Sequence, residues 1–387
     1  MNIKEIDKQY IAGTYSRFDL QIDHGHGAVL YDDQGNEFID FGSGIAVNSF
    51  GLCDKKWEDA LIAQIRRVQH TSNLYYCEPQ AKLAQLLCEK TGMKKVFFSN
   101  SGAEANECAI KTARKYASDK YRGERDTIVT LTDSFHGRTI TTLSATGQET
   151  FHKDFGPFTP GFAYAKANDA DDLKKAVSAN NVCAIMFELI QGEGGVNVLT
   201  KEFVGEIQKI CKENDILMVI DEVQTGNGRT GSLYCYMDYG LQPDIVSTAK
   251  GLAGGLPIGA TLLGEKVQET LTPSSHGSTF GGNPICASGA LSILERLDGE
   301  LLGEVKIKSR LIRETLENTE NVEAVTGIGL LLGVKTKKDA KAVVGECLKR
   351  GLLVLTAKDK VRLLPPLNIT FDELEKGLKI LKEVIEA

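Results

Sequence analysis

The sequence predicts an α/β protein built around a mostly parallel sheet. Short, continuous apolar runs alternate with segments of helical periodicity through the middle of the chain, a pattern typical of strands buried on both faces. The length of 387 residues suffices for a large core or for two domains. Hydrophobic residues make up 42% and charged residues 25% of the chain, as is usual in soluble globular proteins.

The first elements predict a hairpin and two helices. Residues 28–41 alternate apolar and polar side chains around DDQGN, which indicates a β-hairpin. Helical periodicity follows at residues 54–69 and 78–92. In the second segment, Pro79 stands near the expected start and Gly92 near the expected end, the positions that these residues favour in helices.

From residue 95 onward, strands and helices alternate. Strands are expected at residues 95–99, 127–131, 182–188, 216–223 and 244–249, and helices at 104–117 and 201–214. Ligands of such sheets bind in the crevice at the carboxyl ends of the strands. This rule predicts that residues 99–102, 188–193 and 221–224 meet Lys250 at one edge of the sheet.

The last third of the chain changes character. From about Glu265 onward, amphipathic helices and short strands, at residues 327–335 and 361–366, replace the regular alternation. We therefore expect a large domain at residues 46–265. Residues 1–45 and 266–387 together are expected to form a smaller α+β domain.

Composition and terminal sequence exclude several classes of protein. The net charge of -7 argues against an electrostatic nucleic-acid binder. No apolar run is long enough for a membrane span, and the charged N-terminus lacks the apolar region of a secretory signal. The nine cysteines form no C-x-x-C pair and no metal-ligand spacing. We expect a cytoplasmic protein without a metal site and without nucleic-acid or membrane partners.

The sequence SNSGAEANE, at residues 99–107, places small residues between a strand and a helix expected to begin near Ala103. Backbone N–H groups at a helix start bind anions, and glycine lets a phosphate approach closely. A helix capped by Ser101 explains the same residues equally well. The stretch matches neither a P-loop nor a convincing dinucleotide-binding fingerprint.

Asp221 and Lys250 stand where two apolar strands are expected to end. A buried carboxylate needs a partner, and a protonated ring nitrogen would serve. A partly desolvated lysine has a lowered pKa and can form a Schiff base. Taken singly, an ion-paired aspartate and a lysine that reaches the surface are the commoner cases. Together with the anion site, the two residues predict a pyridoxal phosphate site, because that cofactor needs a lysine and an aspartate at its ring nitrogen.

The order of the motifs resembles that of the class III aminotransferases, of pyridoxal phosphate fold type I. The motifs are SGAEANE, SFHGRT, IDEVQTGNGRTG, AKGLAGGLPIGA, HGSTFGGNP and RLLPPL. Within the class, GSGIAVNSFG and HTSNLYY make the chain most similar to the N-acetylornithine aminotransferases. The resemblance implies a seven-stranded-type sheet and transfer of the δ-amino group of N-acetylornithine to 2-oxoglutarate. Another ω-amine substrate (succinylornithine, ornithine, an N-acyl-lysine or GABA), or an aminomutase reaction, is the alternative.

The resemblance also implies roles for residues at the cofactor. Lys250 would form the Schiff base and carry protons, and Asp221 would pair with the pyridine nitrogen. The other expected cofactor contacts are Gly102, Ala103, Phe135, Glu222, Val223, Gln224 and Thr279. Thr279 would come from the partner subunit, which implies a homodimer with shared active sites.

A further set of residues is implied for the substrates. Arg138 would bind the α-carboxylate of the amine donor, with Ser278 nearby. Arg362 would hold the α-carboxylate of glutamate in the other half-reaction, and Glu193 would cover Arg362 at other times. Gly44 stands where ornithine aminotransferases carry a tyrosine and would leave room for an acylated amine, although other acyl groups fit the same space.

Overall fold

The computed structural model describes residues 2–387. Its largest sheet has seven strands in the order β4-β12-β11-β10-β7-β5-β6. The strands are β4 (Lys95–Ser99), β5 (Thr127–Leu131), β6 (Phe162–Ala165), β7 (Val182–Phe187), β10 (Leu217–Asp221), β11 (Ile245–Thr248) and β12 (Gly259–Leu263). Strand β12 is antiparallel to both of its neighbours, and the other neighbouring pairs are parallel. The predicted α/β fold with a mostly parallel sheet is confirmed.

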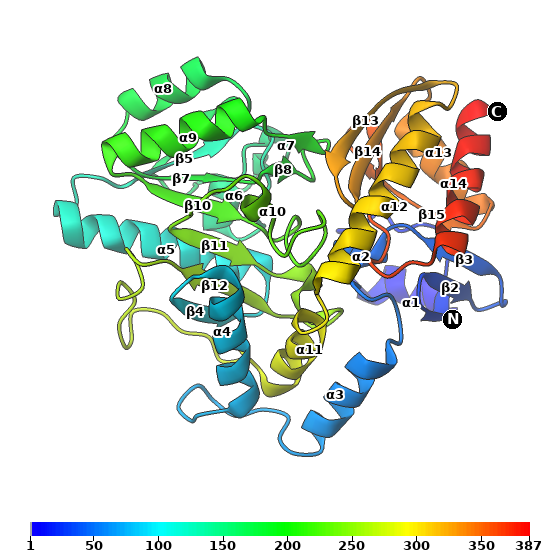
Figure 1. Ribbon diagram of the computed structural model, residues 1–387, viewed down its shortest axis with the longest axis horizontal. Helices are drawn as coiled ribbons and strands as arrows, with labels where there is room; N and C mark the ends of the chain where they lie inside the picture. The colour runs from blue at the N-terminus through cyan, green and yellow to red at the C-terminus, as the bar shows by residue number, and fades with distance from the viewer. Residues whose placement is uncertain (1) are drawn as a thin grey trace.

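Helices cover both faces of this sheet, which explains why its central strands are apolar throughout. Helices α8 (Ala170–Ser178) and α9 (Lys201–Asn214) lie over one face, and α5 (Gly102–Tyr121) lies over the other (Figure 1). Successive residues of β10 point to opposite faces. Val219 packs in the cluster that contains α5, and Ile220 packs in the cluster that contains α9.

Three further helices frame the large sheet. The predicted helices at 54–69 and 78–92 are α3 (Lys55–Ile65) and α4 (Glu78–Thr91), and α4 ends at Gly92 with a left-handed φ of 74°. Both helices pack against α11 (Pro284–Leu294). The shorter elements in this part are α2 (Ser43–Ala46), α6 (Ile140–Ala145), α7 (Glu149–His152), α10 (Cys235–Asp238), the 3₁₀ helix η1 (Lys250–Ala253), β8 (Ile190–Gln191) and β9 (Asn197–Val198).

A smaller group of elements combines the two ends of the chain. The predicted hairpin is β2 (Val29–Asp32) and β3 (Glu37–Asp40), with β1 (Ile22–His26) on one side and β15 (Leu352–Leu353) on the other. A second sheet contains β13 (Val322–Ile328), β14 (Leu331–Thr336), β16 (Leu355–Ala357) and β17 (Lys360–Leu363). Helices α12 (Gly299–Glu317), α13 (Ala340–Lys349) and α14 (Phe371–Glu386) complete this group. Figure 1 shows the N-terminal strands beside the C-terminal helix.

One predicted strand of this region is wrong. Residues 327–335 read as a single strand, but the chain reverses between β13 and β14, which pair antiparallel. The reversal uses Gly327 and Gly329, whose φ angles of 107° and 60° favour glycine. The apolar residues on either side of the turn conceal it in the sequence.

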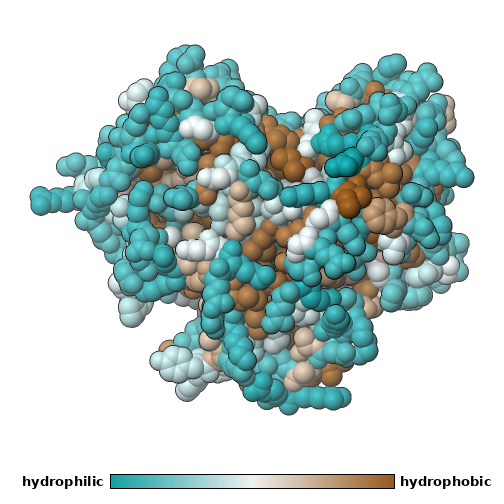
Figure 2. Space-filling model, viewed as in Figure 1, coloured by the Kyte–Doolittle hydropathy of each residue, from teal (hydrophilic) through white to brown (hydrophobic). Residues whose placement is uncertain are grey.

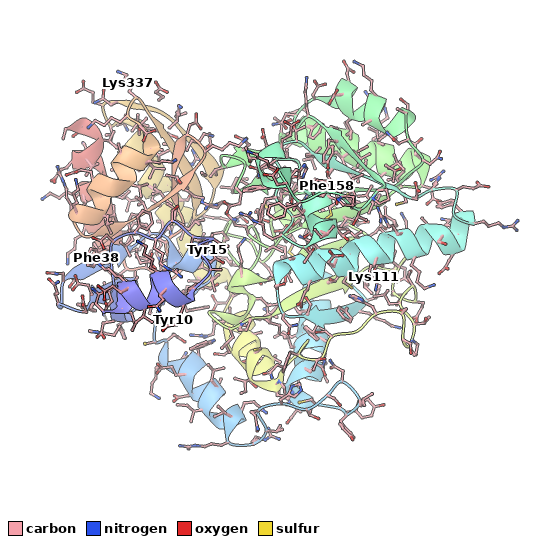
Figure 3. All side chains as sticks on the ribbon, turned by 180° about the vertical axis from the view of Figure 1, so that it is seen from behind. Tyr10, Tyr15, Phe38, Lys111, Phe158 and Lys337 are labelled. Atoms are coloured by element: carbon pink, nitrogen blue, oxygen red, sulfur yellow. The ribbon has the colours of Figure 1, made fainter. Side chains whose placement is uncertain are left out.

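The N-terminal helix is exposed. Helix α1 (Ile3–Tyr10) has no buried residue, and Tyr15, in the segment that follows it, is 74% exposed (Figure 3).

No helix within residues 2–387 is long and apolar enough to cross a membrane. In the space-filling view, the surface is hollowed between the two groups of elements, and hydrophobic side chains gather there (Figure 2).

Candidate active site

The ends of β4, β7, β10 and β11 surround one cavity of about 250 Å³. It is lined by Gly102, Ala103, Asn106, Phe135, His136, Gly137, Arg138, Glu188, Asp221, Val223, Gln224 and Lys250. All four segments that the sequence assigned to this edge of the sheet contribute to the lining. The cavity therefore brings together an amine, two carboxylates and the start of a long helix.

Lys250 follows β11 after one residue, Ala249, and begins the 3₁₀ helix η1. Its φ of 47° lies in the left-handed region, which costs an L-residue other than glycine about 1–2 kcal/mol. Two hydrogen bonds hold the turn. The Asn227 Nδ2 donates to the Ala249 carbonyl at 3.0 Å, and the Ser49 Oγ donates to the Gly251 carbonyl at 3.0 Å.

Burial lowers the pKa of the Lys250 ammonium below 10.5, against the opposing pull of the Glu193 and Asp221 carboxylates. Desolvation disfavours the charged form of the amine, and nearby carboxylates favour it. The first effect is the larger. The neutral amine, which is nucleophilic and basic, is therefore more accessible at Lys250 than at a surface lysine.

The Asp221 carboxylate ends β10 and is 3% exposed. Its Oδ2 accepts hydrogen bonds from the Asn106 Nδ2 at 2.7 Å and from the His136 Nδ1 at 2.8 Å. Its Oδ1 accepts one from the backbone N–H of Val223 at 2.9 Å. These donors fix the plane of the carboxylate, and the sequence did not identify Asn106 as one of them. The only signal was its position, four residues after Gly102 on the helix face that the sheet covers.

His136 and Glu188 share the buried surroundings of Asp221. Burial alone would lower the pKa of His136, but its hydrogen bond to Asp221 and the charges of Asp221 and Glu188 raise that pKa above 6.5. Burial raises the pKa of Glu188 to about 8. Glu188 Oε1 accepts a hydrogen bond from the Phe135 N–H at 2.9 Å. Burial therefore disfavours the charged form of Glu188, and the neighbouring His136 opposes this effect.

The N-terminus of α5 forms an anion-binding wall. Ser101 caps the helix, since its Oγ accepts a hydrogen bond from the Glu104 N–H at 3.2 Å. The N–H groups of Gly102 and Ala103, in the first turn, have no partner within the helix and point along its positive end. A Cβ atom at Gly102 would lie 2.6 Å from a methyl group of Val223. Only glycine fits here, so no side chain at this position covers the backbone N–H groups at the start of α5.

Arg362, from β17, is held by three acceptors. Its Nη1 donates to Glu193 Oε1 at 2.6 Å, to the Gly192 carbonyl at 3.1 Å and to Gln224 Oε1 at 3.2 Å. The Arg362 side chain is 4% exposed and the Glu193 side chain 29% exposed. Burial alone would raise the pKa of Glu193, but the Arg362 charge holds it below 4.5. Glu193 thus stands as a carboxylate on the open side of a buried arginine.

Arg138 lies at the edge of the cavity and is exposed. Its guanidinium carbon is 4.2 Å from the ring centroid of Phe151 and 5.6 Å from that of Phe135. Two arginines with different surroundings therefore stand near Lys250 and Asp221. Arg362 is buried under the Glu193 carboxylate, and Arg138 is open to solvent.

Glu222, expected among the cofactor contacts, turns away from the cavity. Its side chain is buried, and its carboxylate accepts hydrogen bonds from the Thr225 hydroxyl and from the Tyr236 N–H. Neighbouring residues of a strand point to opposite faces, so the carboxylate of Asp221 and that of Glu222 separate. Burial raises the pKa of Glu222 to about 7.

The substitution Glu222→Gln should change how the free energy of unfolding depends on pH. A carboxyl whose folded pKa lies above its unfolded value loses stability as pH rises between the two, here from about 4.5 to about 7. The glutamine variant should therefore gain on wild type by up to about 3 kcal/mol between pH 5 and pH 8.5. Thermal melts at both pH values measure this. If the difference in the free energy of unfolding between the variant and wild type were the same at pH 5 and at pH 8.5, Glu222 would be charged throughout that range.

Ser278, Thr279 and Gly44 lie outside this cavity in the single chain described over residues 2–387. The Ser278 Oγ accepts hydrogen bonds from Asn100 Nδ2 at 3.2 Å and from the Gly281 N–H at 2.9 Å. Thr279 is exposed. Gly44 lines a separate cavity of about 390 Å³. One chain therefore does not assemble every residue that the sequence assigned to the site.

A family model and the relatives of this chain indicate the same family of proteins. The family model described as aminotransferase class-III matches residues 10–385. The chain is 51% identical to the acetylornithine aminotransferase of Haemophilus ducreyi, over 99% of this chain and 98% of that protein. It is 46% identical to the protein of the same name from Caldanaerobacter subterraneus, over 98% of each chain.

Solved structures extend the comparison. An N-acetylornithine aminotransferase from Stenotrophomonas maltophilia matches with a TM-score of 0.85 and 37% identity, over 98% of each chain. An ornithine aminotransferase from Toxoplasma gondii matches with a TM-score of 0.94 and 31% identity, over 99% of this chain and 93% of that one. On these matches and on the family model, the chain belongs to the class-III aminotransferases.

Proposed function

We propose that this protein is a pyridoxal phosphate-dependent N-acetylornithine aminotransferase. It moves the δ-amino group of N-acetyl-L-ornithine to 2-oxoglutarate and gives N-acetyl-L-glutamate 5-semialdehyde and L-glutamate, a reaction of arginine biosynthesis. The carrying observation is that Lys250, Asp221 and the N-terminus of α5 line one cavity. The amine donor rests on the relatives named acetylornithine aminotransferase, and 2-oxoglutarate as the acceptor rests on the resemblance of the motifs to those of the class III aminotransferases.

The residues present fit pyridoxal phosphate. The N–H groups of Gly102 and Ala103 suit a phosphate at a helix start. The Asp221 carboxylate, held by three donors, suits a protonated pyridine nitrogen. The Lys250 amine suits the aldehyde. When bound, the cofactor supplies an electron sink for the negative charge that develops on the substrate carbon.

The protein's own groups then handle the proton and the charges. Lys250, with its lowered pKa, holds the proton that leaves the δ-carbon of the substrate. Asp221, held by three hydrogen-bond donors, would face the ring nitrogen of the cofactor and favour its protonated form. Burial raises the pKa of Glu188, which favours its neutral form beside Asp221. Phe135 and Val223 line the cavity with apolar surface, which reduces access of water.

Arg362 and Glu193 support the use of two unlike substrates. The Glu193 carboxylate occupies the Arg362 guanidinium and is partly exposed. The α-carboxylate of glutamate is chemically equivalent and can take its place when Glu193 turns outward. Arg138 would bind the α-carboxylate of N-acetylornithine, because an arginine fork accepts a carboxylate in bidentate geometry.

A homodimer completes the site in this proposal. Ser278 and Thr279 do not line the cavity of their own chain, as described over residues 2–387. We assign them to the partner's cavity, with Thr279 at the phosphate and Ser278 at the substrate. The dimer would act in the cytoplasm on small molecules, without nucleic-acid or membrane partners.

The visible absorbance of the bound cofactor tests this function. Adding N-acetylornithine without 2-oxoglutarate should convert the absorbance to that of the aminated cofactor, and 2-oxoglutarate should restore it with release of glutamate. Ornithine and GABA, run in parallel, should react more slowly. Conversion with ornithine but not with N-acetylornithine would refute the substrate assignment. Turnover without any need for 2-oxoglutarate would instead indicate an aminomutase.

A further inference from the structure

The exposed Arg138 is held in a different way from the buried Arg362. Within residues 2–387, no hydrogen bond or ion pair engages the Arg138 guanidinium. Instead it lies over two aromatic rings, at 4.2 Å from the centroid of Phe151 and at 5.6 Å from that of Phe135. Both distances fall within the range of cation–π contacts.

The Phe151 ring belongs to a segment that hydrogen bonds hold in place. It belongs to the short helix α7, and hydrogen bonds hold the chain on both sides of it. The Gln148 Nε2 donates to the Ser134 carbonyl at 3.0 Å, and the His152 Nε2 lies 2.8 Å from the Leu143 carbonyl oxygen. The Phe151 ring also meets the Phe135 ring edge-on, with centroids 5.6 Å apart.

We propose that Phe151 is a positioning residue for substrate selection, which holds the Arg138 guanidinium at the cavity mouth for the α-carboxylate of the amine donor. The inference rests on the proposed function and adds a residue to it. An exposed arginine loses side-chain freedom when it binds a carboxylate. A ring that already orders the guanidinium removes part of that loss.

The choice of an aromatic ring has a chemical reason. A carboxylate partner would order Arg138 equally well but would occupy the N–H donors that the substrate needs, as Glu193 does at Arg362. A ring face attracts the cation and leaves its N–H donors free. Arg138 is therefore always ready for a carboxylate, whereas Arg362 is available only when Glu193 moves.

Two substrates and two variants test the proposal. N-acetylputrescine has the amine and the acetamide of N-acetylornithine but lacks the α-carboxylate. Phe151→Leu should raise KM for N-acetylornithine about 2- to 30-fold and leave kcat/KM for N-acetylputrescine unchanged. The control Phe151→Tyr, which keeps the ring, should stay within about 2-fold of wild type on both substrates. KM for 2-oxoglutarate and the affinity for pyridoxal phosphate should not change in either variant.

A double-mutant cycle with Arg138→Ala locates the effect. If Phe151 acts through the guanidinium, Phe151→Leu should add nothing in the Arg138→Ala background. Equal losses on N-acetylornithine and on N-acetylputrescine, or a full further loss in that background, would overturn the proposal and indicate a packing role. An unchanged KM for N-acetylornithine in Phe151→Leu would overturn it as well.

A binding measurement separates this inference from the proposed function. N-acetyl-L-norvaline keeps the acetamide and the α-carboxylate but has no δ-amine, so its binding by calorimetry does not require turnover. The Phe151→Leu variant of the holoenzyme should bind it more weakly by the same factor, and Phe151→Tyr should not. If the wild-type enzyme binds N-acetyl-L-norvaline but does not turn over N-acetylornithine, the proposed function is refuted, and the comparison of the Phe151 variants still tests the inference. Equal binding of N-acetyl-L-norvaline by wild type, Phe151→Leu and Phe151→Tyr would refute the inference alone.

Discussion

Replacing Lys250 by alanine should abolish transamination while the cofactor-free protein stays folded. The amine is the group in the cavity that can bond to an aldehyde and move a proton, and general acid–base catalysis alone contributes about 10²–10⁴-fold to a rate. We expect the turnover rate to fall by at least about 10³-fold. Glutamate release in the presence of N-acetylornithine and 2-oxoglutarate measures it.

Stability should move in the opposite direction. Because burial lowers the pKa of Lys250 in the folded protein, the amine costs stability below its unfolded pKa of about 10.5, and the cost grows as pH falls until it passes the folded pKa. The cofactor-free alanine variant should therefore unfold at a temperature equal to or above that of wild type, with a gain at pH 6 at least as large as that at pH 9. Calorimetric melts at pH 6 and pH 9 test the sign.

The matched control is Lys266→Ala. Lys266 belongs to the same part of the chain and pairs with Asp244 at 3.3 Å, outside the cavity. Its removal should leave turnover within about 2-fold of wild type, as for most surface substitutions. Turnover that survives in Lys250→Ala would refute both the role of Lys250 and the proposed function.

The sequence predicts best those elements whose local pattern and tertiary surroundings agree. Residues 95–99, 127–131 and 201–214 form the expected strands and helix with the expected bounds. Strand β12 was not predicted, although it is fully buried. It follows a glycine-rich turn without a separating signal, and its antiparallel pairing with β4 and β11 depends on contacts far apart in the chain. Strand β6 was not predicted either, and it is short and lies at the sheet edge.

The candidate site divides in a similar way. Asp221 and Lys250 were predicted because a charged residue directly after a buried strand is costly unless it has a partner or a task. Asn106 was not, since its contact with Asp221 spans 115 residues. Phe151 was missed as well, because no local pattern connects it with Arg138. The orientation of Glu222 depends on the backbone after β10, which the sequence does not specify.

Replacing Asp221 by asparagine should reduce turnover by about 10²- to 10³-fold, the usual cost of removing one oriented charge or donor from a catalytic site. The variant keeps the shape of the side chain but loses the negative charge that stabilises a protonated ring nitrogen. The affinity for pyridoxal phosphate should fall as well, and the absorbance of the bound cofactor should become sensitive to pH near neutrality. Titration of absorbance and equilibrium dialysis measure these two effects.

His136 gives this prediction a readout that does not depend on activity. Asp221 supplies the hydrogen bond and much of the charge that raise the pKa of His136. In Asp221→Asn, burial should dominate, so the pKa of His136 should fall below 6.5. Nuclear magnetic resonance can follow this, because the chain has 6 histidines. An unchanged titration of His136 would contradict the geometry around Asp221.

Glu222→Gln is the matched control for the charge at Asp221. Both substitutions turn a buried carboxylate into an amide at adjacent positions of the chain, but Glu222 faces Thr225 and Tyr236 rather than the cavity. If direct contact with the cofactor is what matters, only the change at Asp221 should alter the affinity for pyridoxal phosphate and the absorbance of the bound cofactor. If lost negative charge near the end of β10 were sufficient by itself, both variants should be impaired to a similar degree at pH 8.5, where Glu222 is ionised as well. A common loss would therefore remove Asp221 from its proposed role at the ring nitrogen, and a loss confined to Asp221→Asn would assign that role to the one carboxylate that lines the cavity.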